Sequence, residues 1–152
     1  MLSAGDKVPN FSLLDADGQR VNSSDFLGQK WLVWFYPKAS TPGCTAEGCN
    51  LRDNHAEFEA KGVQIVGISM DSVKRQNNFA TKNGFPYRLL SDVDGTTVRA
   101  FGAWGSKKFM GREYDGILRS SFLIDENGVI EHVWAKVKTK THGVDVLAEL
   151  NR

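Results

Sequence analysis

Both cysteines of the 152-residue chain lie in the stretch TPGCTAEGC, Thr41 to Cys49, five positions apart. Thiols can act as nucleophiles, bind metals, form a disulfide or remain inert in a core. Zinc is disfavoured, because the chain has only two Cys and three His and none shows a C-x-x-C or H-x-x-x-H spacing. A redox dithiol of the C-x-x-C type would have two intervening residues instead of four. Inert or reactive thiols therefore remain as the main alternatives.

The residues around the cysteines predict a helix from Thr41 to Ala60. Thr41 can cap its N-terminus, and Pro42 suits the first helical position, where no N–H is needed. Cys44 then lies in the first turn, among backbone N–H groups without partners and at the positive end of the helix dipole. This placement stabilises a thiolate and favours a reactive role for Cys44.

One face of the predicted helix is apolar. Leu51, His55 and Phe58 recur at helical spacing, and Cys44 continues their face toward the N-terminus. Cys44 is therefore expected to point inward. His55 is interpreted as a histidine packed beside the core, without a chemical role.

Cys49 lies roughly 140° around the helix from Cys44 and about 7.5 Å along its axis. The corresponding Cα separation is about 8.6 Å from helix geometry, whereas a disulfide tolerates at most ~7 Å. The two thiols can therefore join only if the helix between them unwinds. Gly48 costs the helix roughly 1 kcal/mol relative to Ala, so it should ease unwinding, and Gly48→Ala should favour the helix if a methyl group fits there.

The overall composition is that of an ordinary soluble domain. Hydrophobic residues make up 41% and charged residues 24% of the chain, and the formal net charge is +1, so electrostatics give no reason to expect binding to nucleic acid or to a membrane. The start MLSAGDKVPN lacks the apolar segment of a signal peptide, and no apolar run is long enough to span a membrane. We expect one domain over residues 1–152, located in the cytoplasm, where a cysteine pair is more typical of redox chemistry than of a structural disulfide.

Alternating apolar strands and helices predict an α/β fold. The run WLVWFY, residues 31–36, is bounded by Pro37 and suits a central strand buried on both faces. Residues 11–22 should form an N-terminal hairpin. Other strands are expected at 63–70, 87–92, 119–125 and 129–135, and other helices at 72–83, 96–101 and 144–150. This order predicts a central mixed β-sheet flanked by helices, with the strands at 119–125 and 129–135 joined as a hairpin.

Two segments carry weaker signals. Residues 103–116 are rich in glycine and show no periodicity, so they are expected to form a loop. The segment KVKTK, residues 136–140, is interpreted as a sheet edge protected by lysines rather than as a phosphate-binding strip.

The segment FYPKASTPGCTAEGCNLRD resembles the active-site segment of peroxiredoxins, with the pattern P-x-x-x-T-x-x-C at Pro37, Thr41 and Cys44. A second cysteine five residues later is similar to the peroxiredoxin Q, or bacterioferritin-comigratory protein, subfamily. The resemblance extends over nearly the whole chain and includes GDKVPNFSLLDADG, VGISMDS, LLSDVDG, GREYDGILRSSFLIDENG and VWAKVKTKTHGVDVL. It implies a thioredoxin-like fold with an added N-terminal β-hairpin, and a peroxidase that works without haem, flavin or metal.

By position, the resemblance implies a role for each residue of the motif. Cys44 would attack the O–O bond of a hydroperoxide and become a sulfenic acid, and Cys49 would resolve that acid into a disulfide. Pro37 would shield the site. The hydroxyl of Thr41 would hydrogen-bond peroxide and thiolate, and Arg119 would hold both of them.

Two further residues follow from the same resemblance. Glu47 would orient Arg119, and Gly43 would line the substrate site together with the motif residues. Without the resemblance, Arg119 at the start of a strand would be interpreted as a surface ion-pair residue, and Thr41 only as a helix cap.

The resemblance also implies partners for an antioxidant enzyme of this kind. Hydrogen peroxide and organic hydroperoxides are the expected substrates, and thioredoxin is the expected reductant, with glutaredoxin or glutathione as alternatives. A monomer is expected, because the internal cysteine pair removes the need for a second chain. A disulfide reductase or isomerase on the same fold and a non-catalytic redox-sensing module remain alternatives, which peroxide consumption with a thiol reductant would separate.

The segment 104–112 leaves two interpretations open. It could form the rim of the pocket or a docking site for the reductant. Alternatively, Trp104, Phe109 and Met110 could be tucked beneath an ordinary loop.

Overall fold

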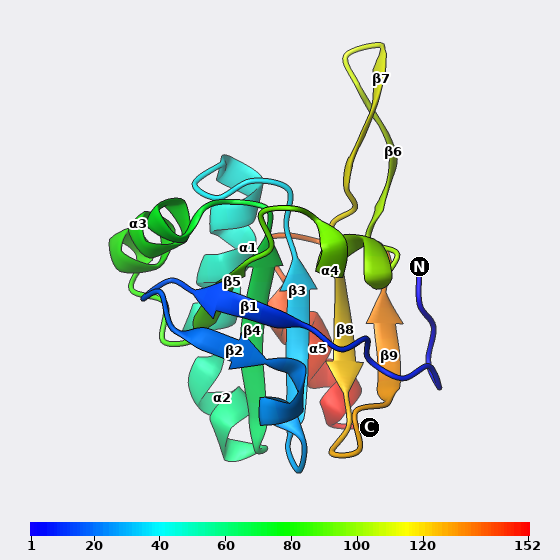
Figure 1. The fold of residues 1–152 in the computed structure, drawn as a ribbon. Helices are drawn as coiled ribbons and strands as arrows, with labels where there is room; N and C mark the ends of the chain where they lie inside the picture. Colours follow the sequence, from blue (N-terminus) through cyan, green and yellow to red (C-terminus); the bar gives the residue numbers. More distant parts are fainter.

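The computed structural model describes residues 1–152, and a seven-stranded mixed β-sheet lies at their centre (Figure 1). The strand order is β2-β1-β5-β4-β3-β8-β9, and β6 and β7 form a separate two-stranded sheet. Strands β3, β4 and β5 are parallel, whereas β1, β8 and β9 run antiparallel to their neighbours. The strands are β1 Ser12–Asp15, β2 Arg20–Asn22, β3 Lys30–Phe35, β4 Val63–Ser69, β5 Arg88–Ser91, β6 Trp104–Phe109, β7 Arg112–Ile117, β8 Ser120–Ile124 and β9 Ile130–Trp134.

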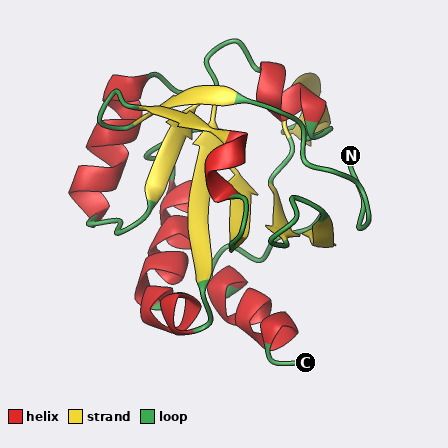
Figure 2. Ribbon diagram, turned by 60° about the horizontal axis from the view of Figure 1, so that its bottom comes forward, coloured by secondary structure: helices red, strands yellow, loops and turns green.

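Helices cover both faces of the sheet (Figure 2). Buried side chains of four helices pack on one face: α1 Pro42–Asp53, α2 His55–Ala60, α3 Val73–Asn83 and α5 His142–Leu150. The opposite face is covered by α4 Thr96–Ala100, by the short 3-10 helix η1 Ser23–Phe26 and by residues near the N-terminus. The predicted α/β architecture is confirmed.

Strand β3 lies in the middle of the sheet because its sequence is apolar on both faces. The residues from Trp31 to Phe35 are at most 2% exposed. Leu32 and Trp34 pack in the core beneath α1 and α5, whereas Val33 and Phe35 pack in the core on the other side. The C-terminal end of β3 therefore leads directly into the loop that carries the cysteine segment.

The other predicted elements are confirmed in type, with small differences at their ends. The N-terminal hairpin forms as β1 and β2, and Asp15 closes its turn by accepting hydrogen bonds from the N–H groups of Asp17 and Gln19 at 2.9 Å each. Helix α3 begins after Ser72, whose hydroxyl accepts from the Arg75 N–H, and it ends at a left-handed Gly84. None of the helices combines the length and apolar character that crossing a bilayer requires.

The single helix predicted for residues 41–60 is instead two helices. Asn54 separates α1 from α2, with φ −103° and ψ 5°. Its side-chain amide donates to the Asn50 carbonyl oxygen at 2.8 Å. An asparagine that hydrogen-bonds the backbone in this way competes with the helical pattern, which explains the break.

The loop predicted for residues 103–116 is wrong, because this segment forms the β6–β7 hairpin. The hairpin projects from the body of the molecule (Figure 1). Its two turn residues, Met110 and Gly111, both have positive φ, 50° and 80°. Such a turn matches the twist of paired strands, but it usually has the sequence Asn-Gly or Asp-Gly. With Met110 in the first position, the sequence did not indicate a hairpin.

The sheet edge predicted for residues 136–140 is also wrong. Strand β9 ends at Trp134, and the residues after it cross as an irregular connection to α5. The chain has to leave the sheet there, because α5 packs over the face that also carries α1. Within this connection, Thr139 lies next to the first turn of α1.

Candidate functional site

Cys44 lies in the first turn of α1, directly after the loop that follows β3. Its side chain is completely buried and lies in the same core cluster as Leu51 of α1 and Phe58 of α2, which are also 0% exposed. The inward orientation predicted from the helical spacing is therefore confirmed. The N–H groups of this first turn have no helical acceptor, so they surround the thiol with positive partial charge.

Thr41 occupies the position before the helix, and Pro42 is its first residue. The expected cap does not form, because the Thr41 hydroxyl donates instead to the Lys38 carbonyl oxygen at 2.7 Å. Ser40, with φ 64°, turns the chain so that Thr41 faces back along the loop. Pro37, at the start of the same loop, is half-buried.

Arg119 reaches this site through the strand register. It lies in the two-residue connection between β7 and β8. Ser120 pairs with Phe35 at the end of β3. Because neighbouring strands place paired residues side by side, Arg119 lies next to the loop that begins the cysteine segment.

The guanidinium of Arg119 contacts two acids at once. Its Nη2 donates to Cys44 Sγ at 3.4 Å, and its Nη1 donates to Glu47 Oε1 at 2.7 Å. Gly43 makes room for this arrangement, because a Cβ at that position would lie 3.1 Å from Arg119 Nη2. The structure thus brings together Gly43, Cys44, Glu47 and Arg119, as expected from the sequence.

Glu47 is a fully buried carboxyl group with only one hydrogen-bonded oxygen. Burial raises the pKa of Glu47 to about 7, and the opposing effect of Arg119 is smaller. Its second oxygen, Oε2, has no hydrogen-bond partner. Near neutral pH this carboxyl group can therefore gain or lose its proton beside Arg119.

His142 faces the unpaired oxygen of Glu47. Its Nε2 lies 3.9 Å from Glu47 Oε2 and 2.7 Å from Ser121 Oγ. His142 is 1% exposed, and burial lowers its pKa to about 4, with Arg119 acting in the same direction and Asp145 in the opposite one. The imidazole is therefore neutral above pH 5, so it does not compete with Arg119 as a cation.

Cys49 lies further along α1, partly exposed, and both cysteines are free thiols. Its Sγ lies 3.7 Å from Asn83 Oδ1 at the end of α3. The helix between the two cysteines is continuous. Helix geometry therefore keeps the thiols apart, as expected.

Gly48 is fixed by contacts that the sequence did not suggest. Its carbonyl oxygen accepts a hydrogen bond from the Tyr87 hydroxyl at 2.8 Å. A Cβ at Gly48 would lie 2.5 Å from Cζ of Phe85, whose ring stacks on Tyr87 and meets Phe79 edge-on. The expectation that Gly48→Ala stabilises the helix depended on space for a methyl group, and that space is absent.

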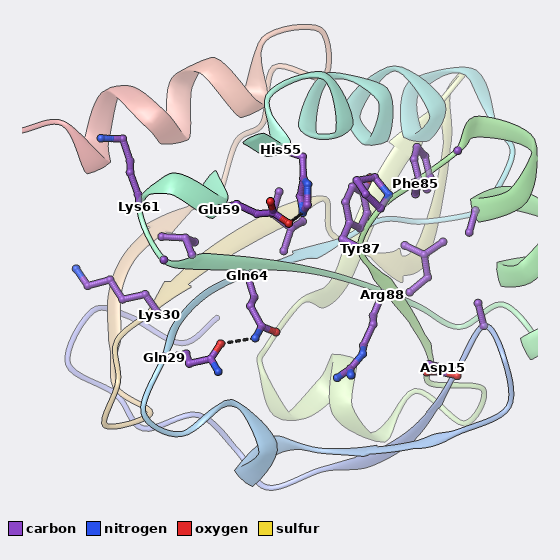
Figure 3. Close-up of a pocket in the computed structure, with 18 of the residues that line it drawn as sticks. Asp15, Gln29, Lys30, His55, Glu59, Lys61, Gln64, Phe85, Tyr87 and Arg88 are labelled. Atoms are coloured by element: carbon purple, nitrogen blue, oxygen red, sulfur yellow. Dashed lines mark hydrogen bonds and ion pairs between the residues drawn. The ribbon is translucent and has the colours of Figure 1, made fainter. Parts of the chain in front are cut away.

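A broad groove lies apart from the cysteine site (Figure 3). It lies beside α2, α3 and the starts of β4 and β5, and neither Cys44 nor Arg119 lines it. Charged side chains of both signs surround it, among them Lys30, Glu59 and Arg88. Phe85 and Tyr87, which contact Gly48, form part of its wall, so the groove is adjacent to the middle of α1.

The β6–β7 hairpin begins next to the site and ends in solvent. Lys107 donates to the Ile117 carbonyl oxygen at 2.8 Å, and burial, followed by the charge of Arg119, lowers its pKa. At the tip, Phe109 and Met110 are 66% and 87% exposed. The interpretation that these two residues are tucked beneath a loop is therefore wrong, whereas the base residue Trp104 does pack against the core.

Sequence reasoning missed His142, Ser121, Phe85 and Tyr87. Ser121 and His142 lie within segments that carry the resemblance, but nothing in those segments indicates a role for them, and none of the four lies at a regular spacing from the cysteines. His142, Phe85 and Tyr87 reach α1, and Ser121 reaches His142, only through packing between elements that are distant in the sequence. No local pattern could have identified them.

The arrangement is suited to a thiolate nucleophile. A buried sulfur atom lies at a helix N-terminus and beside a guanidinium, and both stabilise negative charge. The same guanidinium and the Cys44 N–H can donate hydrogen bonds to oxygen atoms of a bound substrate, and the Thr41 hydroxyl can do so by turning its single hydrogen away from the Lys38 carbonyl oxygen.

Comparisons with known proteins agree in pointing to one family. The family model described as the AhpC/TSA family matches residues 4–133. Peroxiredoxin Bcp of Escherichia coli K12 is 53% identical over 141 residues, covering 93% of this chain and 90% of the relative.

Solved structures give the same result. A Xylella fastidiosa PrxQ mutant has a TM-score of 0.93 and 32% identity, covering 99% of this chain and 96% of the other. A Xanthomonas campestris bacterioferritin comigratory protein, studied for its alkyl peroxide reduction activity, has a TM-score of 0.87 and 38% identity, with 93% and 90% covered.

Glu47→Gln should change how stability depends on pH. In the parent, the pKa of Glu47 is raised from 4.5 to about 7, so its contribution to the free energy of unfolding falls as pH rises through that range. The pKa of His142 is lowered from 6.5 to about 4, so its contribution rises with pH between those values. The two slopes oppose each other, and the parent should show a flat profile where they overlap.

With Glu47→Gln only the His142 contribution remains, so the free energy of unfolding from urea titrations should rise between about pH 4 and pH 6.5. His142→Gln should give the opposite slope, with stability falling between pH 4.5 and about pH 7. If the free energy of unfolding depends on pH as weakly in both variants as in the parent, this account of Glu47 and His142 is contradicted.

Proposed function

The chain belongs to the AhpC/TSA family, as a peroxiredoxin and hence a thiol peroxidase, and we propose that Cys44 is its attacking thiol and Cys49 its resolving thiol. The observation that carries this assignment is the contact of Arg119 with Cys44 Sγ at 3.4 Å, on a guanidinium that Glu47 holds at 2.7 Å. Cys49 has no such cation in contact with its sulfur atom.

The reaction proceeds in two thiol steps. The Cys44 thiolate attacks one oxygen of ROOH, an S–O bond forms, the O–O bond breaks, and the leaving RO⁻ takes up a proton to give alcohol or water. The product at Cys44 is a sulfenic acid. The Cys49 thiolate then attacks that sulfur, a disulfide forms, and hydroxide leaves and is protonated to water.

Catalysis depends on the donors around the peroxide as well as on the thiolate. A helix N-terminus stabilises a nearby anion by only about 0.3–2 kcal/mol. Nucleophilicity also falls as a thiolate becomes easier to form. Arg119, the Thr41 hydroxyl and the Cys44 N–H therefore have a second role, which is to stabilise charge as it moves along the S–O–O line. Pro37 and Gly43 shape the pocket around these donors.

The second step requires α1 to open. The helix is continuous between the two cysteines, and a helical separation of about 8.6 Å between their Cα atoms exceeds what a disulfide spans. The enzyme therefore alternates between a folded reduced state and a locally unfolded oxidised state.

Hydroperoxides, both hydrogen peroxide and organic ones, are the proposed substrates. The similarity to the Xanthomonas campestris protein studied for alkyl peroxide reduction supports the organic class. Thiol donors reduce the disulfide, and thioredoxin is the proposed donor. The proposal includes a monomer acting as one domain over residues 1–152 in the cytoplasm, where a reducing environment keeps two such cysteines free between turnovers.

The two cysteine variants test the assignment of roles. Cys44→Ser should abolish peroxide reduction, because no other thiol contacts Arg119. Cys49→Ser should consume about one equivalent of peroxide and then stop at a sulfenic acid or a mixed disulfide. Mass spectrometry after titration with peroxide counts both products, and full turnover by Cys44→Ser would overturn the proposal.

Arg119→Lys should slow peroxide reduction more than it reduces the thiolate fraction at pH 7. Lysine keeps the positive charge but cannot donate to Cys44 and Glu47 through one planar group. Stopped-flow fluorescence measures the second-order rate constant, and ultraviolet absorbance of the thiolate measures its fraction. An unchanged rate constant would remove Arg119 from the peroxide step.

Gly48→Ala should speed disulfide formation rather than slow it. The new methyl group would collide with Phe85, and overpacking costs about 1–3 kcal/mol, against about 1 kcal/mol gained in helix propensity. A net loss of about 1 kcal/mol would raise the open population roughly fivefold. Peroxide attack, timed separately by stopped-flow fluorescence, should hardly change.

The double variant Gly48→Ala/Phe85→Ala provides the control. In the double variant the Phe85 ring is absent, so the methyl group fits. Because alanine favours the helix more than glycine does, disulfide formation should be slower than in Phe85→Ala alone. If Gly48→Ala slows resolution in the presence of Phe85, the ring does not hold this part of the helix.

A further inference from the structure

The loop from Pro37 to Thr41 is held in a strained conformation. Ser40 has φ 64°, which is uncommon for a residue other than glycine and costs free energy. Such a conformation persists only where the surroundings hold it. The Thr41 hydroxyl bonds only within the loop, to the Lys38 carbonyl oxygen, so this contact cannot anchor the loop to the rest of the protein.

One contact does anchor the loop to the core. The N–H of Ala39 donates to Asp71 Oδ2 at 2.7 Å, across 32 positions of sequence. Ala39 and Asp71 are both 8% exposed. A hydrogen bond from a buried N–H to a carboxylate is charge-assisted and stronger than one between neutral groups.

Asp71 is itself fixed by a buried polar network. Its Oδ2 also accepts from the Ser69 hydroxyl at 2.7 Å, and Gln76 Nε2 donates to Ser69 Oγ at 2.9 Å. Gln76 in turn donates to the Leu90 carbonyl oxygen and accepts from the Tyr36 hydroxyl. The network therefore ties the ends of β3, β4 and β5 to the loop.

We propose that Asp71 is a positioning residue for the peroxide step, because its carboxylate holds the Ala39 N–H and thereby places the Thr41 hydroxyl and the Cys44 N–H toward the reacting oxygens. This inference rests on the proposed function of Cys44. Asp71 touches neither the thiol nor the substrate. It acts through the loop, and loss of the anchor releases the strained turn at Ser40.

The position of the loop should affect the rate of peroxide reduction more than it affects the formation of the Cys44 thiolate. Arg119 and the first turn of α1 face the Cys44 sulfur atom, and Asp71 hydrogen-bonds to neither of them. Peroxide reduction also needs oriented donors, and a displacement of about 1 Å can cost about 100-fold in rate. The ratio of the rate constant for peroxide reduction to that for a reaction that needs only the thiolate therefore distinguishes a positioning role of Asp71 from a general loss of structure.

The experiment uses the Cys49→Ser chain, in which Cys44 is the only thiol. Two second-order rate constants are measured at the same pH: oxidation by hydrogen peroxide and alkylation by iodoacetamide, which needs the thiolate but no donors for oxygen. Asp71→Ala should lower the peroxide rate constant by about 10–100-fold and the alkylation rate constant by less than about threefold. Asp71→Asn, which keeps an oxygen acceptor for Ala39, should restore most of the peroxide rate.

Asp15→Ala is the matched control. Asp15 is also 8% exposed and also accepts hydrogen bonds from main-chain N–H groups, but it does so in the β1–β2 turn. The Asp15→Ala variant should be less stable than its parent, but the ratio of its two rate constants should be unchanged. If Asp71→Ala is largely unfolded, Asp71→Ser, whose hydroxyl is too short to reach Ala39, should show the same selective loss.

The outcomes are distinct. A selective loss of peroxide rate in Asp71→Ala, with recovery in Asp71→Asn, supports the inference. Equal loss of both rate constants, or no loss, overturns it. If the Cys49→Ser parent itself shows no oxidation of Cys44 by peroxide, the proposed function fails instead.

Discussion

The guanidinium of Arg119 determines the character of the site, because it is one cation that faces two buried acids. It donates to Cys44 Sγ at 3.4 Å and to Glu47 Oε1 at 2.7 Å. An unpaired charge is expensive in such a pocket, and burial raises the pKa of Glu47 to about 7. A protonated Glu47 leaves the charge of Arg119 available to the thiolate, whereas an ionised Glu47 shares it. The neutral His142 completes the pocket without adding a second cation.

Helix α1 is subject to opposing requirements. The thiolate site is built from the first turn of the helix, so it exists only while α1 is folded. The disulfide requires the same residues to unfold, because the folded helix separates the thiols. The contacts of Phe85 and Tyr87 with Gly48 lie between the two cysteines and stabilise the folded state. The loop before α1 is anchored separately, by Asp71, so the peroxide pocket and the resolving segment depend on different parts of the core.

Much of the fold could be predicted from the sequence, because periodicity, caps and turn residues are local properties. The apolar run of β3 and the helix between Ser72 and Gly84 were predicted for physical reasons that the structure bears out. The failures are also local. Met110 occupies a turn position usually taken by Asn or Asp, so the β6–β7 hairpin was mistaken for a loop. Asn54 breaks a helix that its apolar periodicity predicted to continue.

By itself the sequence determined the pair of cysteines, their spacing along one helix, the inward face of Cys44 and, through its long motifs, the family. These properties depend on neighbouring residues or on the pattern of residues along the chain. Only the tertiary structure decided which side chains meet the thiol and hold its loop. Arg119 is 75 positions from Cys44, Asp71 is 32 from Ala39 and Tyr87 is 39 from Gly48. Strand register and packing between distant elements create these contacts, and no local propensity encodes the distance of a guanidinium from a sulfur atom or the absence of space beside a glycine.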